Sequence, residues 1–146
     1  LNNFFRCNTA FLSTLLVITI FLSPSIADIE VECEFGFSQN LTVLESVLQC
    51  DIKNLKVFID NENVTRINGN LTLQDDKNVT YTVKDVKFLT INNQSIQYLP
   101  SGFGAQFPNL EGLQINGSRL QILTHDNLKE FPYLQYLDVE NNEIER

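Results

Sequence analysis

The sequence predicts an α/β repeat protein, in which short units stack into a solenoid with a parallel sheet on its concave side and a mostly β cap at its N-terminal end. Two observations predict this fold class. The same pattern of aliphatic residues begins at Val86, Leu110 and Leu134, with a constant 24-residue spacing. The segment before Val86 lacks the repeat and contains short apolar and polar alternations, as strands with one buried face do. We divide the chain into a signal peptide at 1–27, a cap at 28–85 and repeats at 86–146.

Segment 1–27 has the three parts of a signal peptide. Arg6 supplies a positive charge, and a largely apolar run extends from Phe11 to Leu22. Ser25 and Ala27 are small residues at the two positions that signal peptidase recognises, so we expect cleavage after Ala27. A membrane anchor is the alternative, but the apolar run is well short of the roughly 20 apolar residues that an anchor needs.

Segment 28–85 is expected to form the cap that shields the first core layer of a solenoid. From Ile29 to Phe35, apolar residues alternate with glutamates, which predicts a strand of an edge hairpin with one buried face. We expect a second strand at 46–57 and a third at 66–73.

The cysteines predict one disulfide. Cys7 would be lost with the signal peptide, which leaves Cys33 and Cys50 as an even pair in a secreted chain. The bridge would close the loop from Cys33 to Cys50 and stabilise the fold by about 3 kcal/mol. A metal site is not expected, because two cysteines and the single His125 supply too few ligands.

Each repeat copy fits the spacing L-x-x-L-x-L-x-x-N-x-L in its aliphatic positions. In the first copy, Leu89 and Ile91 flank Thr90, so a strand would point both aliphatic side chains into the core and Thr90 outward. Asn142 occupies the asparagine slot of the third copy, and Ser118 is a small polar substitute in the second. Gln94 departs from the pattern, so position 94 carries a weaker turn signal, as expected for a first copy next to a cap.

On these motifs, the segment 86–146 resembles an extracellular animal leucine-rich repeat protein of the typical 24-residue class. Members of this family usually carry an N-terminal cap with cysteines, often four. The two cysteines here make the cap similar to the sparser caps of insect secreted or cell-surface members. The resemblance implies a solenoid that recognises a partner and says little about which one.

The number of copies is small. Two copies are complete, and the third ends at Arg146, just after its strand and turn. Val64 and Ile67 hint at an earlier degenerate copy, but the step from Val64 to Val86 is shorter than the repeat period, so this copy is not counted. Because a stable stack needs about three copies and the sequence contains no methionine, we expect an N-terminal fragment of a longer product.

Six Asn-x-Ser/Thr triplets support an extracellular location, because they accept glycans only in the secretory pathway. The acceptor residues are Asn40, Asn63, Asn70, Asn78, Asn93 and Asn116. Since four of them precede residue 81, we expect the cap to be the more heavily glycosylated part.

The concave face is the predicted binding surface, and its candidates are the outward positions of each copy. Phe88 and Tyr136 share one column across a gap at Gly112, and exposed aromatic residues are frequent anchors of interfaces. They would equally serve as local cover for the sheet. Glycans at Asn93 or Asn116 would crowd this face and favour binding near the third copy. The partner-binding candidates are Phe88, Thr90, Gln114, Tyr136, Asp138 and Glu140.

Catalysis and cofactors are not expected. His125 would lie on the convex return beside Asp126, where polar residues more often satisfy loop backbone. Gly102 and Gly104 are turn residues, because no Lys-Ser/Thr sequence follows them to complete a phosphate loop.

The expected function is recognition of a protein or glycan by a secreted or cell-surface module, in adhesion, ligand capture or innate immunity. Removal of 1–27 takes away Arg6 and no acidic residue, and the resulting net charge of −9 disfavours binding to nucleic acid and anionic lipid. Two alternatives stay open: the ectodomain of a signalling receptor whose membrane segment is missing from this chain, and a structural protein of the extracellular matrix. The oligomeric state is not predicted.

Overall fold

The structure is a computed structural model that describes residues 27–39, 46–71 and 79–145. Its strands are β1 (Ala27–Gln39), β2 (Ser46–Lys53), β3 (Lys56–Val57), β4 (Glu62–Asn68), β5 (Phe88–Asn92), β6 (Ser95–Ile96), β7 (Gly112–Asn116) and β8 (Tyr136–Asp138). Its helices are η1 (Val83–Asp85), α1 (Phe103–Gln106) and α2 (His125–Lys129). Short helices accompany a mainly strand architecture, which confirms a small α/β-type domain. The predicted signal peptide lies outside the described residues, apart from Ala27.

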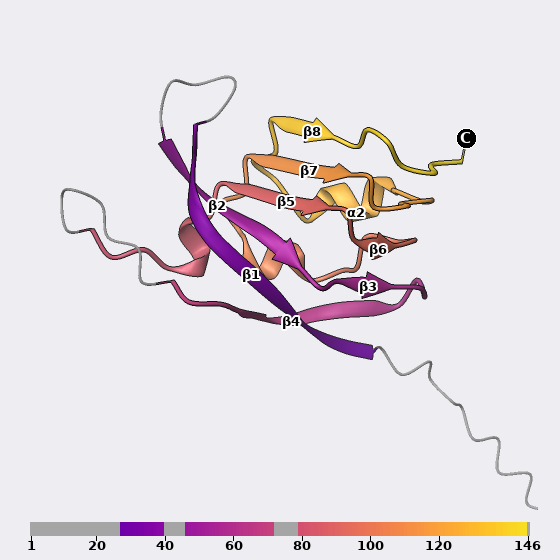
Figure 1. Ribbon diagram of the computed structural model, residues 1–146, viewed down its shortest axis with the longest axis horizontal. Coiled ribbons are helices and arrows are strands. Elements are labelled where there is room, and N and C mark those ends of the chain that lie inside the picture. The colour runs from indigo at the N-terminus through magenta and orange to yellow at the C-terminus, as the bar shows by residue number, and fades with distance from the viewer. Residues whose placement is uncertain (1–26, 40–45, 72–78, 146) are drawn as a thin grey trace, which may run out of the picture.

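Six strands form one mixed sheet in the order β4-β1-β2-β5-β7-β8, and β3 pairs with β6 beside it (Figure 1). β1 and β2 are antiparallel, and all other neighbours are parallel. The expected edge position of β1 is wrong, because β4 pairs with its other side. The strand expected at 66–73 begins earlier, at Glu62, because Val64 is buried in the core and its backbone N–H donates to Ser101 at 2.8 Å.

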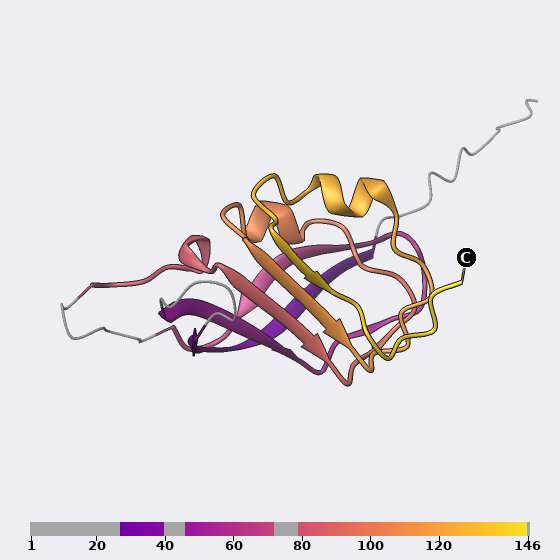
Figure 2. The ribbon, with the colours of Figure 1, turned by 90° about the horizontal axis from the view of Figure 1, so that it is seen from above.

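The 24-residue period of the sequence is also the register of the sheet. β5, β7 and β8 pair in parallel so that each residue lies beside its equivalent in the next copy. Leu89, Leu113 and Leu137 form one such column. The first two are completely buried, whereas Leu137 is 41% exposed because β8 is the last strand in the sheet order. Figure 2 shows α1 and α2 on the same side of these strands.

The asparagine slot that follows each strand joins neighbouring copies through side-chain hydrogen bonds. Asn142 donates to the carbonyl oxygen of Ile115 at 2.6 Å and accepts from the backbone N–H of Ser118 at 3.0 Å. Ser118 is completely buried, and its hydroxyl donates to the carbonyl oxygen of Ile91 at 2.6 Å. A single asparagine or serine therefore satisfies backbone groups that the end of a strand leaves unpaired.

Gln94 performs the same task with a longer side chain, although the sequence signal for a turn is weaker at this position. Its Oε1 accepts from the backbone N–H of Leu55 at 2.8 Å, and its Nε2 donates to the carbonyl oxygen of Asn92 at 2.8 Å. The additional methylene lets the amide reach into the cap. Gln94 thus connects the first copy to the strands that precede it.

The cap contains a further copy of the strand pattern, which the sequence reading did not identify. β2 pairs with β5, and β3 pairs with β6, at one constant 39-residue offset. At this offset Cys50 lies beside Leu89 and Val57 beside Ile96, and all four side chains are buried. We call Cys50–Val57 the cap copy. Val64 and Ile67, which we did not count as a copy, belong to β4, which pairs with β1 on the side away from β2.

One backbone feature recurs in all four copies. The residue just before the slot adopts a left-handed conformation, with φ between 54° and 61°. The residues in this column are Asn54, Asn93, Gly117 and Asn141. Asparagine and glycine tolerate this conformation better than other residues do. The column therefore relates the cap copy to the others by backbone geometry as well as by strand pairing.

The predicted disulfide is present between the two antiparallel strands. Cys33 on β1 and Cys50 on β2 are both buried, with their Cα atoms 5.5 Å apart. The bond ties β1 to the cap copy at the point where the cap meets the first repeat strand. Across the described residues, no helix is long and apolar enough to cross a membrane.

Candidate functional site

The candidate site is the side of the six-stranded sheet that faces away from the core, which we call the outer face. Alternation along each strand puts polar residues there, because the intervening residues are buried. The outer-face residues are Arg66 and Asn68 on β4, Glu30, Glu32 and Glu34 on β1, Gln49, Asp51 and Lys53 on β2, Phe88, Thr90 and Asn92 on β5, Gly112, Gln114 and Asn116 on β7, and Tyr136 and Asp138 on β8, with Glu140 just beyond it.

An aromatic pair spans three strands of this face. The rings of Phe88 and Tyr136 lie 5.7 Å apart between centroids, although β7 separates their strands. Gly112 makes this possible, since a Cβ there would lie only 2.3 Å from Cδ2 of Phe88. The structure therefore brings the two predicted aromatic residues into contact over the glycine. Both rings keep part of their surface exposed.

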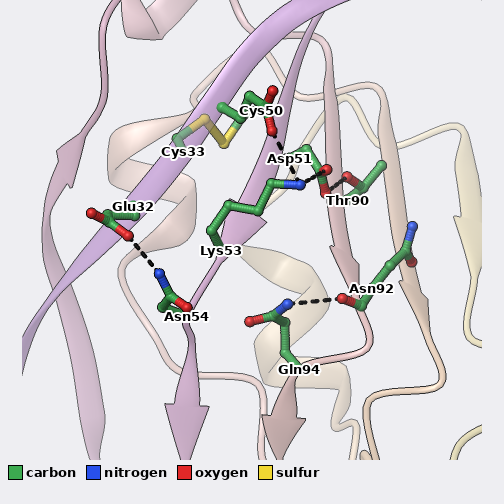
Figure 3. A network of polar contacts seen from close by, with 10 residues as sticks. Glu32, Cys33, Cys50, Asp51, Lys53, Asn54, Thr90, Asn92 and Gln94 are labelled. Carbon is green, nitrogen blue, oxygen red and sulfur yellow. Dashed lines mark hydrogen bonds and ion pairs between the residues drawn. A yellow bond between two sulfur atoms is a disulfide. The ribbon is translucent and has the colours of Figure 1, made fainter.

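The prediction that Thr90 is available to a partner is wrong. Its side chain points outward, but it is only 4% exposed because its hydroxyl donates to Oδ1 of Asp51 on the neighbouring strand at 2.6 Å (Figure 3). Lys53 also bonds to Asp51 and lies 3.2 Å from Glu34. The hydrogen bond with Asp51, followed by the one with Glu34, raises the pKa of Lys53 above its ordinary value. These four residues form a closed polar cluster over the cap strands.

The other predicted polar residues are also linked to one another. Nε2 of Gln114 donates to Asp138 at 2.9 Å, and Asp138 accepts from the backbone N–H of Glu140 at 3.0 Å. Gln114 and Asp138 are half-buried, whereas Glu140 is exposed. These two hydrogen bonds hold the Asp138 side chain in a defined orientation on the same strand as Tyr136. This part of the outer face therefore offers a rigid carboxylate next to an aromatic ring.

The outer face is acidic. Among the outer-face residues, six are carboxylates, and Lys53 and Arg66 are the two cations. Two ion pairs lie at its margins, Arg66 with Glu30 at 3.3 Å and Lys87 with Glu111. They leave the net charge of the outer face negative. Glu34 and Asp51 lie directly opposite each other on β1 and β2, and only Lys53 of this face offsets their repulsion. Such a surface attracts positive charge and repels anions.

The glycosylation candidates differ in accessibility. Asn70 and Asn93 are exposed, whereas Asn63 and Asn116 are half-buried. Asn116 accepts a hydrogen bond from Asn141 at 3.0 Å, and its triplet includes the buried Ser118. Two further candidates, Asn40 and Asn78, lie outside the described residues. The exposed position of Asn93 keeps it as a candidate glycan site, at the end of β5 opposite to the aromatic pair.

The residues considered for chemistry occupy structural positions. His125 is the exposed first residue of α2, which the preceding Thr124 caps by accepting from the N–H of Asn127 at 3.2 Å. Gly102 and Gly104 each donate a backbone N–H group to the carboxylate of Glu130 at 3.0 Å. Within 27–39, 46–71 and 79–145, no three His, Cys, Asp or Glu residues are grouped to hold a metal ion.

Comparison of the chain with protein-family models, curated proteins and solved structures found no match.

Proposed function

We propose that the chain is a secreted or cell-surface leucine-rich repeat module that binds a partner protein through the outer face of its sheet, without catalytic activity. The observation that carries this proposal is the agreement between the 24-residue sequence period and the parallel strand register. This register places equivalent positions of successive copies side by side, so that each variable position forms a column on the sheet. Rigid columns of varied side chains are suited to recognition, because little conformational entropy is lost on binding.

The extracellular location rests on three independent features. The buried disulfide favours an oxidising compartment, the segment 1–27 has the organisation of a signal peptide, and exposed asparagines carry glycosylation triplets. A cytosolic protein has no need for the first two features. Together they support export of the chain.

The charge and the aromatic residues of the outer face restrict the kinds of partner that it can bind. The excess of carboxylates on the outer face favours a cationic or neutral protein surface over an acidic glycan. The contact centre that fits best is the aromatic pair with Asp138, since Tyr136 combines apolar area with a polar hydroxyl. A glycan at Asn93 would leave Tyr136 and Asp138, on the last strand of the sheet, accessible.

The proposal can be tested by screening the secreted chain against an array of extracellular proteins. A partner found there would be titrated with the wild type, with the Tyr136→Ala/Asp138→Ala double variant and with Tyr133→Ala. Tyr133 is 60% exposed and lies outside the sheet, so it is a matched control. We expect the double variant to bind roughly tenfold or more weakly and Tyr133→Ala to bind like the wild type. Unchanged affinity of a folded double variant would refute the assignment.

A further inference from the structure

A groove lies away from the outer face, beside the return segments. The groove has a volume of about 320 Å³ and lies between the β3–β4 connection, the segment after β6 and the start of α2. Ile59, Tyr98 and Pro100 form its apolar wall, and Asp60, Glu62 and Asp126 form its acidic side. Among the described residues, no lysine, arginine or histidine lines it. Its volume is at the lower end of the range for ligand pockets and is sufficient for one long side chain.

The apolar wall is part of a column created by the repeat. Ile59 and Tyr98 are related by the 39-residue offset of the cap copy, and Tyr98 and Ile122 pair in a parallel bridge at the 24-residue offset. Ile59 is 54% exposed and Ile122 is 44% exposed. Ile59 and Ile122 therefore present large apolar side chains toward solvent at positions equivalent to Tyr98, which is partly buried and packs against the core. Aligned exposed apolar residues are a typical feature of an interaction surface.

Glu62 supplies the second, independent observation. Its Oε2 atom is buried, yet it has no hydrogen-bond partner among the described residues. The backbone carbonyl of Glu62 is occupied, since it accepts from the N–H of Ser101 at 3.1 Å, so the chain holds this residue in place. Glu62 is partly exposed as a residue and lines the groove, so a cationic donor that enters can meet this carboxylate, whose buried Oε2 receives no hydrogen bond from the described residues.

We propose that this groove binds an arginine side chain presented by a partner protein. The guanidinium group would meet the Glu62 carboxylate, with Asp60 adding negative charge at the rim, while its aliphatic stem lies along Ile59 and Tyr98. Arginine fits better than lysine, because the guanidinium is weakly hydrated, has several donors and packs well on aromatic rings. This site is independent of the outer face.

The test uses peptide probes and the full chain. Amide chemical shifts of Ser101 and Thr124, which line the groove, would be followed by NMR during titration with acetyl-Leu-Arg-Leu-amide. The matched probe replaces arginine with citrulline, which has nearly the same shape without the charge. We expect saturable shifts with the arginine peptide and binding at least about tenfold weaker with the citrulline peptide. Equal binding of both peptides, or no binding, would overturn the proposal.

Variants separate the groove from general charge attraction. Glu62→Gln should weaken the arginine peptide about tenfold. Glu145→Gln is the control, since Glu145 is exposed, carries the same charge and lies outside both the groove and the outer face, so affinity should be unchanged. Asp60→Asn, at an exposed position, gives a second test that does not disturb packing and should weaken binding several-fold. An equal effect of Glu62→Gln and Glu145→Gln would contradict a specific site.

Discussion

Gly112 illustrates how a single residue shapes the outer face. Its missing side chain leaves the space in which the Phe88 ring lies and meets Tyr136. A side chain at this position would separate the two rings and would force Phe88 away from the sheet. The glycine is therefore required by packing, because its φ is not among the positive values in the described chain.

Gly112→Ala is expected to destabilise the fold by about 1–3 kcal/mol, because the added Cβ overlaps the Phe88 ring and forces it out of place. Denaturant unfolding measures the change. Gly36→Ala is the matched control, since Gly36 also lies in a strand of the sheet and a Cβ there meets nothing within 4 Å. Equal stability of the two variants would show that the aromatic pair does not depend on Gly112.

Ser118→Ala is expected to cost about 1–3 kcal/mol, because the buried carbonyl of Ile91 and the N–H of Gln94 both lose their hydroxyl partner. The substitution also removes the glycosylation triplet of Asn116. Asn116→Gln is therefore the control, since it removes the same triplet and keeps the hydroxyl. Thermal unfolding should separate the two variants, and a loss of stability in both alike would attribute the effect to the glycan.

At the scale of the elements, the cap copy shows that part of the cap has the strand pattern of the repeats. It was missed in the sequence because the cap copy and the first repeat are related by a 39-residue offset, which differs from the 24-residue period of the repeats. Cys50 stands where the repeats have leucine, and Leu55 occupies the polar slot. The signal that could have revealed it is Asn54, which matches the asparagine or glycine before the slot in every other copy.

The left-handed column leads to a prediction about residue preference. Gly117→Ala is expected to cost about 1 kcal/mol, because alanine disfavours the φ of 61° found there. Gly117→Asn should cost less, since asparagine occupies the other three positions of the column. Unfolding experiments on both variants would compare them directly. A more stable alanine variant would contradict the common backbone geometry of the copies.

For the whole molecule, the 24-residue period correctly predicted which repeat residues are buried and which ones share a column. Val86, Leu89 and Ile91 are buried as expected, and Phe88 and Tyr136 share a column. The burial of Thr90 could not be predicted, because it depends on Asp51 from a strand that the repeat spacing does not reach. The position of β4 beside β1 is likewise a long-range pairing without a sequence period.

Export of the whole chain is the next prediction. When the chain is expressed in animal cells with its own segment 1–27, the secreted protein should begin at Asp28 and carry glycans at the exposed Asn70 and Asn93. N-terminal sequencing and glycopeptide mass spectrometry measure both properties. Asn70→Gln should reduce the mass by one glycan. Retention of an unmodified chain in the cytosol would contradict an extracellular role.

Hydroxyl-radical footprinting of the complex with a partner found by the array tests the central claim most directly, because it reports which face the partner covers. Our account predicts protection of Phe88 and Tyr136 on the outer face. Tyr133, which is 60% exposed outside the sheet, should react as in the free chain. Protection of Tyr133 with unchanged reactivity of Phe88 and Tyr136 would contradict binding through the outer face.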